Sequence, residues 1–200
     1  MAVYAIFTQE GLEENLKYKI EERFLRPGEE VYILMNNRLK KYDGEYKTIT
    51  RPLFPGYVFV NTEDEERLRA HFRRNTEISK LLYSPEANDN IVLLSEEEEK
   101  ILDQLCGKVH VLDISTGYKD ENGAHITSGP LVGMENMIKK INRHKRIAVI
   151  EIDIFGKREG GLTNTSRALD SSRDGKAVNS DYEPRESKSK HAEIILPVQS

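Results

Sequence analysis

The densest run of positive charge in the sequence lies between residues 139 and 146. It holds five cations and one histidine without an acidic residue: Lys139, Lys140, Arg143, His144, Lys145 and Arg146. Such side chains contact phosphates and displace the counterions around a nucleic acid, which contributes strongly to binding. The run therefore indicates an RNA contact, although a solvated turn without a partner can have the same composition.

A second basic stretch runs from Arg38 to Lys47 and has tyrosines between its cations. Asp43-Gly44 in its middle is the strongest short signal for a β-hairpin. The cations and rings on its arms are Arg38, Lys40, Lys41, Tyr42, Tyr46 and Lys47. Cations beside stacking faces suit single-stranded nucleic acid. An ordinary solvated hairpin is the alternative interpretation.

A third candidate is the short segment from Arg73 through Arg74 and Asn75 to Thr76. It follows an apolar helical pattern that includes Leu68 and Phe72. Cations at the end of a helix suit its partial negative charge, so a purely structural role explains this segment as well.

The residue types needed for catalysis or metal binding do not occur at useful spacings. The histidines are scattered: His71, His110, His125, His144 and His191. Cys106 is the single cysteine, so no Cys-x-x-Cys zinc motif exists. No phosphate-binding loop or nucleophile elbow is present. We therefore expect a protein that is not an enzyme and needs no cofactor or metal.

The bulk composition limits the class of protein. The chain has 200 residues, a net charge of −4, 38% hydrophobic and 32% charged residues. This length suits one or two domains with a real core. The net charge argues against a protein that coats nucleic acid everywhere, but it allows local basic patches. No apolar run approaches the roughly 20 residues of a membrane helix, and the lone cysteine fits a reducing compartment. We expect a cytoplasmic monomer with no membrane partner.

The apolar pattern predicts an α+β N-terminal domain over residues 1–107, with helices packed on an antiparallel sheet. The expected strands are 3–8, 31–35, 57–60, 78–83 and 91–94. Leu12, Leu16, Ile20 and Phe24 repeat at helical spacing. Two further helices should begin at capping boxes, Thr62 with Glu65 and Ser95 with Glu98, and the second should stop at Gly107.

The composition changes after Gly107. Residues 108–122 have no helical period and are expected to be a linker. Residues 123–200 show short strands and turns, which predict a small β-barrel. Within them, residues 157–190 contain too few large apolar residues to offset the entropy of ordering and should be a disordered insertion or tail.

The stretch Arg51-Pro52-Leu53-Phe54-Pro55-Gly56-Tyr57-Val58-Phe59-Val60 organises the N-terminal domain. Prolines cannot donate to a sheet, so a strand is entered here after a turn. The simpler interpretation is a core strand with a kinked entrance. The alternative is that the kink holds Phe54 and Tyr57 at the surface as a docking patch.

This stretch resembles the central strand of the NGN domain of NusG-type transcription factors. Residues 128–135 (Ser-Gly-Pro-Leu-Val-Gly-Met-Glu), continuing to Ile154-Phe155-Gly156, resemble the KOW module that follows NGN in the same family. Within the family, the Lys140–Arg146 run is most similar to the specialised antiterminator paralogues called LoaP. The resemblance implies an NGN α/β sandwich followed by an SH3-like KOW barrel. In that module a closing strand follows the Phe-Gly pair, and here it is either displaced toward residues 191–198 or missing.

The resemblance also implies partners. Phe54 and Tyr57, with Tyr4 on the neighbouring strand, would contact the clamp helices of RNA polymerase. Arg74, Asn75 and Thr76 would face non-template DNA, and the KOW module would contact nascent RNA, the ribosome or a termination factor. The implied function is suppression of pausing and termination. A ribosome-associated KOW-type RNA-binding protein is the alternative.

Overall fold

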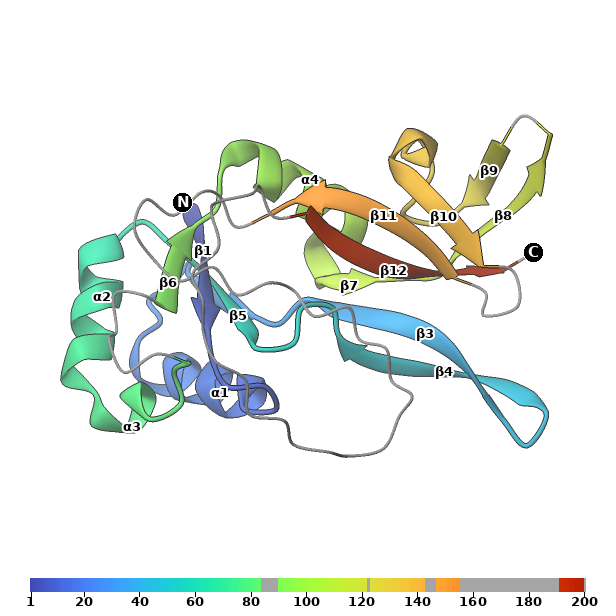
Figure 1. The fold of residues 1–200 in the computed structure, drawn as a ribbon. Coiled ribbons are helices and arrows are strands. Elements are labelled where there is room, and N and C mark those ends of the chain that lie inside the picture. Colours follow the sequence, from blue (N-terminus) through green and yellow to red (C-terminus); the bar gives the residue numbers. More distant parts are fainter. Residues whose placement is uncertain (84–89, 122, 143–146, 155–190, 200) are drawn as a thin grey trace, which may run out of the picture.

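The computed structural model describes residues 1–83, 90–121, 123–142, 147–154 and 191–199 (Figure 1). Over these ranges the chain forms α-helices, short 3-10 helices and strands in three sheets. This is a mixed α/β architecture, as the sequence predicts. None of the helices in the described ranges is long and apolar enough to cross a membrane. The predicted disorder of residues 157–190 concerns a segment outside these ranges.

A four-stranded antiparallel sheet forms the centre of the N-terminal half, in the order β2-β5-β1-β6. Its strands are β1 (Ala2–Phe7), β2 (Glu30–Tyr32), β5 (Tyr57–Thr62) and β6 (Ile91–Leu93). Side chains alternate between the two faces of a strand. Val58 and Val60 therefore face one apolar cluster, while Phe59 faces another. Both faces of β5 are covered, which fits the continuous apolar run of its first four residues, Tyr57–Val60.

Helices bury their apolar stripes on this sheet. They are α1 (Glu13–Arg23), α2 (Glu65–Arg74), α3 (Thr76–Ser79) and α4 (Glu96–Cys106). The first three belong to the cluster around Val58, to which α1 contributes Leu16 and Ile20. Helix α4 contributes Leu102 and Leu105 to the opposite cluster. The sheet is thus enclosed between helices of different parts of the chain.

A long hairpin extends from the N-terminal half (Figure 1). It consists of β3 (Met35–Tyr42) and β4 (Glu45–Pro52), and β7 (Val111–Leu112) pairs parallel with the base of β3. Asp43 and Gly44 both have positive φ, 48° and 91°, as a two-residue hairpin turn requires. The Asp43-Gly44 prediction is therefore confirmed.

The C-terminal half forms a five-stranded sheet in the order β10-β11-β12-β8-β9. Its strands are β8 (Ser115–Asp120), β9 (Gly123–Ser128), β10 (Ile138–Asn142), β11 (Ile147–Asp153) and β12 (His191–Gln199), with 3-10 helices η2 (Gly107–Val109) before it and η3 (Glu135–Met137) within it. Strand β12 pairs antiparallel along β11, from Ile147↔Pro197 to Asp153↔His191. Of the two alternatives for the closing strand, displaced or missing, the structure shows a displaced strand paired with β11. A closed barrel is not evident, because no pairing in the described ranges joins β9 to β10.

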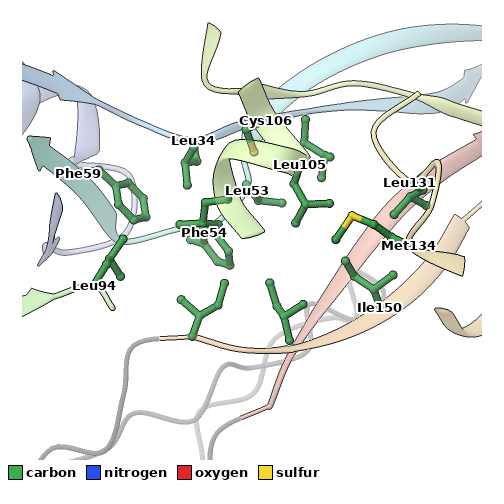
Figure 2. Close-up of a cluster of buried hydrophobic side chains, with 14 of the residues drawn as sticks. Leu34, Leu53, Phe54, Phe59, Leu94, Leu105, Cys106, Leu131, Met134 and Ile150 are labelled. Atoms are coloured by element: carbon green, nitrogen blue, oxygen red, sulfur yellow. The ribbon is translucent and has the colours of Figure 1, made fainter. Parts of the chain in front are cut away.

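The two halves share one apolar cluster (Figure 2). Leu34, Leu53 and Phe54 come from the N-terminal half, and Met134 and Ile150 come from the C-terminal half. All are buried. The five-stranded sheet therefore packs on the face of the N-terminal half that presents the Pro52–Tyr57 turn.

Several local expectations need correction. Helix α2 is capped by Asp64, whose side chain accepts from the backbone N–H of Arg67, and Thr62 instead donates to Glu29 over 2.6 Å. The strand expected at 78–83 is replaced by α3 and a single bridge between Thr8 and Leu82. The stretch expected to be a linker contains β7 and β8. By contrast, the capping box of Ser95 and Glu98 is present as predicted.

Candidate functional site

The turn between β4 and β5 is held rigidly from three sides. The backbone N–H of Leu53 donates to Leu34 O over 2.7 Å, and the N–H of Thr8 donates to Gly56 O over 2.9 Å. Glu13 on α1 is buried, and its carboxylate accepts from the N–H of Gly56 over 2.6 Å. Gly56 has φ of +82°, and a Cβ there would lie 3.1 Å from Thr8 O. Only glycine fits this position without strain.

The aromatic residues of the expected polymerase patch do not lie together at the surface. Phe54 is only 9% exposed and belongs to the cluster shared by both halves (Figure 2). Tyr57 is partly buried beside it, with ring centroids 6.2 Å apart. The alternative that the kink exposes Phe54 is therefore wrong for this conformation, because the C-terminal half covers it, and the simpler interpretation of a core strand with a kinked entrance agrees with its burial.

Tyr4 belongs to a different environment from Phe54. It is 4% exposed and lies in the cluster on the opposite face of the sheet. Its hydroxyl donates to Glu65 over 3.4 Å, and burial, together with that carboxylate, raises the pKa of the phenol. In the register of β1 and β5, Phe7 is the residue paired with Tyr57, and their rings lie 4.7 Å apart. Sequence reasoning overlooked Phe7, which the alternation of β1 places on that side.

The hairpin of β3 and β4 carries an exposed basic and aromatic tip. Tyr42 and Tyr46 are 40% and 41% exposed. The Lys40 ammonium lies 5.0 Å from the ring centre of Tyr42, and that of Lys41 lies 5.9 Å from the ring of Tyr46. Lys47 is exposed and pairs directly opposite Lys40 in the ladder. Like charges facing each other are unfavourable in a hairpin unless a counterion or a phosphate lies nearby.

Arg38 differs from the lysines of the tip. It lies in the middle of β3 and is partly buried, and its Nε has no hydrogen-bond partner in the described part of the chain. Burial, reinforced by the neighbouring charge of Arg51, lowers the pKa of its guanidinium. Arg38 therefore lies in the central section of the hairpin, and its Nε donor is left without a hydrogen bond there.

Arg74, Asn75 and Thr76 line a depression of about 480 Å³ at the junction of α2 and α3. Arg74 and Thr76 are exposed. The side-chain oxygen of Asn75 caps α3 by accepting from the N–H groups of Glu77 and Ile78 over 3.1 and 3.2 Å. The side-chain NH2 group of Asn75 does not take part in this cap and can donate to a ligand.

Three residues that the sequence reasoning overlooked complete this depression: Arg23, Arg67 and His71. Arg67, His71 and Arg74 follow each other at spacings of four and three residues along α2, so their helical periodicity places them on one face. Burial, then the positive charges of Arg67 and Arg23, lower the pKa of His71. The depression therefore places the His71 imidazole, whose pKa is lowered, beside the guanidinium groups of Arg23 and Arg67.

The basic run of the C-terminal half is only partly described. Lys139 and Lys140 are exposed on β10. Arg143, His144, Lys145 and Arg146 lie outside the described residues. The strands on either side pair antiparallel, with Asn142 opposite Ile147, as the expected hairpin requires.

The titratable groups of the described ranges offer little for covalent or metal chemistry. No three His, Cys, Asp or Glu side chains in those ranges lie close enough to hold a metal ion. Cys106 is buried, and burial, with Asp103 nearby, raises its pKa to about 12. The thiol thus stays protonated and unreactive at neutral pH.

Comparison with known proteins agrees with the architecture of the N-terminal half. The family model described as transcription termination factor nusG matches residues 1–103, which is more than half of the chain. The transcription termination/antitermination protein NusG of Staphylococcus carnosus (strain TM300) is 24% identical over 160 residues, covering 77% of this chain and 87% of that protein. The protein of the same name from Staphylococcus aureus (strain Mu50 / ATCC 700699) is 25% identical over the same shares of both chains. This chain belongs to the NusG family.

Proposed function

We propose that this protein binds RNA polymerase and suppresses pausing and termination, as a specialised antiterminator of the LoaP type. The observation that carries the proposal is the family match over residues 1–103, which includes the whole Leu53–Val60 stretch. The basic run at 139–146 supports the specialised role. The mechanism is binding in the cytoplasm, by a monomer, with no covalent chemistry.

The proposal divides the chain into an NGN domain at residues 1–107 and a KOW-like module at 123–200. The turn that carries Phe54 and Tyr57 is fixed by Glu13, Thr8 and Leu34, and a fixed turn suits a docking element because little freedom is lost on binding. Phe54 and Tyr57 are proposed as the anchors for the clamp helices. Tyr4 acts indirectly, because it is buried on the other face of β1.

Docking at this face requires a conformational step. In the present conformation Phe54 lies under the five-stranded sheet. The polymerase cannot contact a side chain that is buried in the cluster shared by both halves, so the C-terminal half must move away when the polymerase binds.

Two surfaces are proposed for nucleic acid. Arg74, Asn75 and Thr76 are proposed to contact non-template DNA beside the depression that they line. The hairpin tip at Lys40–Lys47 and the 139–146 run are proposed to contact RNA, through the exposed lysines and the two exposed tyrosines.

Single-round transcription across an intrinsic terminator, with purified bacterial RNA polymerase, tests the proposal. Added protein should increase read-through, and Tyr57→Asp should abolish the increase. Phe54→Asp is a poorer test, because a buried charge there would destabilise the fold. Tyr18→Asp, which changes an exposed tyrosine on α1, is the matched control. If read-through and pausing do not respond to the wild-type protein on any leader sequence, the function is wrong.

The ribosome-associated alternative gains no support from the comparisons, since the matched proteins are named as transcription factors. Cofractionation with ribosomes and not with polymerase would be the result that reinstates it.

A further inference from the structure

One carboxylate joins two helices at the edge of the Arg74–Thr76 depression. Glu77, on α3, is exposed, and its Oε2 atom accepts from Lys19 Nζ over 2.8 Å and from Arg23 Nη1 over 3.2 Å. Lys19 and Arg23 lie four residues apart on α1, so they project from the same face. A single anionic oxygen is therefore held between two cations that come from another part of the chain.

A phosphate oxygen could take the position that Glu77 Oε2 holds between Lys19 and Arg23. Lysine and arginine both bind phosphate, and arginine does so with directed N–H groups. Arg74, the next cation around the depression, is exposed and has no ion pair in the described part of the chain. Glu77 therefore neutralises Lys19 and Arg23, whereas Arg74 keeps its charge available.

The ion pairs of the neighbouring arginines leave Glu77 as the carboxylate that controls the charge of this rim. Arg67 is already committed to Glu29 and Asp64, and it also donates to Phe24 O over 2.6 Å. Arg23 has a second partner in Glu22 at 3.2 Å, but that residue is its direct neighbour on α1 and does not line the depression. Glu77 is thus the acidic group among the residues that line it.

We propose that Glu77 is a built-in competitor for phosphate, which keeps Lys19 and Arg23 oriented but limits the affinity of this rim for single-stranded DNA. The inference rests on the proposed contact of Arg74, Asn75 and Thr76 with non-template DNA, and adds Lys19 and Arg23 as latent phosphate ligands. A weak contact suits a factor that must follow a moving polymerase, because a tightly held strand would resist translocation. The carboxylate is a fixed anion of the protein that a passing phosphate can displace.

The test is fluorescence anisotropy of the full chain with a labelled single-stranded oligodeoxynucleotide over a range of salt concentrations. Glu77→Gln keeps the size of the side chain and removes its charge. We expect affinity to rise on the order of threefold to tenfold at low salt, and the slope of log K against log salt to steepen by up to about 1.4, which is about 0.7 for each released phosphate ligand.

Glu21→Gln is the matched control. It changes the net charge of the chain by the same amount, but Glu21 lies on α1, its partner is Lys17 and it does not line this depression. It should leave the slope unchanged. Adding Arg23→Gln to the Glu77→Gln variant should remove part of the gain, since the freed guanidinium is lost.

The outcomes separate this inference from the contact on which it rests. If the wild-type chain binds the oligonucleotide and Glu77→Gln behaves like Glu21→Gln, then Glu77 is only a structural tie between α1 and α3 and the inference is wrong. If neither the wild-type chain nor Glu77→Gln binds, the DNA contact itself fails and the inference fails with it. Read-through in the transcription assay tests polymerase docking independently of both.

Discussion

The carboxylate of Glu13 holds the backbone N–H of Gly56 at 2.6 Å, and thereby joins the start of α1 to the turn that enters β5. The bond is buried. Acidic residues at the start of a helix are ordinarily explained by the partial positive charge there. Glu13 instead reaches out of its helix and fixes the Phe54-Pro55-Gly56-Tyr57 turn, so the position of the proposed docking element depends on it.

Replacing Glu13 by alanine should therefore destabilise the protein. The N–H of Gly56 would lose its partner in a buried environment, which costs about 1–3 kcal/mol. Glu14→Ala is the control, because Glu14 lies in the same first turn of α1 but is exposed. Urea unfolding of both variants measures the difference. Equal midpoints would mean that water replaces the Glu13 carboxylate at no cost.

Features that depend on neighbouring residues were predictable from the sequence. The Asp43-Gly44 turn and the Ser95–Glu98 capping box are both present, because each is determined within a few residues. The Thr62–Glu65 capping box failed for a long-range reason. Glu29, 33 positions away, takes the Thr62 hydroxyl, and Asp64 caps the helix in its place.

The burial of Phe54 could not be predicted locally. Phe54 shares a cluster with residues far along the chain, among them Ile150 on β11 and Met134, which directly precedes η3. The depression around Arg74 was missed for a similar reason, because Arg23 comes from α1. The helical spacing of Arg67, His71 and Arg74 in the sequence could have predicted the part of the depression that α2 contributes.

His71 should make stability depend on pH near neutrality. Its folded pKa is lowered from 6.5 by burial, then by Arg67 and Arg23, so the unfolded chain binds a proton first as pH falls. The contribution of His71 is complete above pH 6.5 and is lost as pH falls below that value toward the folded pKa. Urea midpoints between pH 8 and pH 5 should decline for the wild-type chain and less steeply for His71→Gln. Identical pH profiles would contradict the assignment.

The hairpin tip and the 139–146 run should contribute separately to RNA binding. Changing Lys40, Lys41 and Lys47 to glutamine should weaken binding and reduce the salt slope by about 2, at about 0.7 per lysine for single strands. Tyr42→Ala combined with Tyr46→Ala should weaken binding by about 1–3 kcal/mol per stacked base without changing the slope.

A second set of variants in the same RNA experiment changes Lys139 and Lys140, and leaves the hairpin intact. If only these changes reduce the slope, RNA binds the C-terminal half and the hairpin is an ordinary solvated one. If only the hairpin changes matter, the basic run on β10 plays no part. Filter binding or anisotropy with one RNA at several salt concentrations measures all the variants.

The covered docking face leads to the last prediction. If Phe54 and Tyr57 contact the polymerase, the fraction of molecules with the C-terminal half displaced sets the apparent affinity. Met134→Asp puts a charge into the shared cluster and should weaken the cover, and because Met134 belongs to the C-terminal half, the cost of burying that charge falls on the cover and leaves the proposed anchors on the N-terminal half unchanged. Even a cover that contributes only about 1.4 kcal/mol would lower polymerase affinity about tenfold, so the variant should bind more tightly by that factor.

Val132→Asp is the control for this variant, because Val132 lies two residues from Met134 and is 49% exposed. It should bind polymerase as the wild-type chain does. Adding Tyr57→Asp to Met134→Asp should abolish the gain, because the uncovered face would then lack one of its anchors. Tighter binding that persists in the double variant would place the polymerase contact elsewhere on the N-terminal half. If Met134→Asp binds polymerase no more tightly than the wild-type chain, the packing of the C-terminal half on the shared cluster does not limit docking.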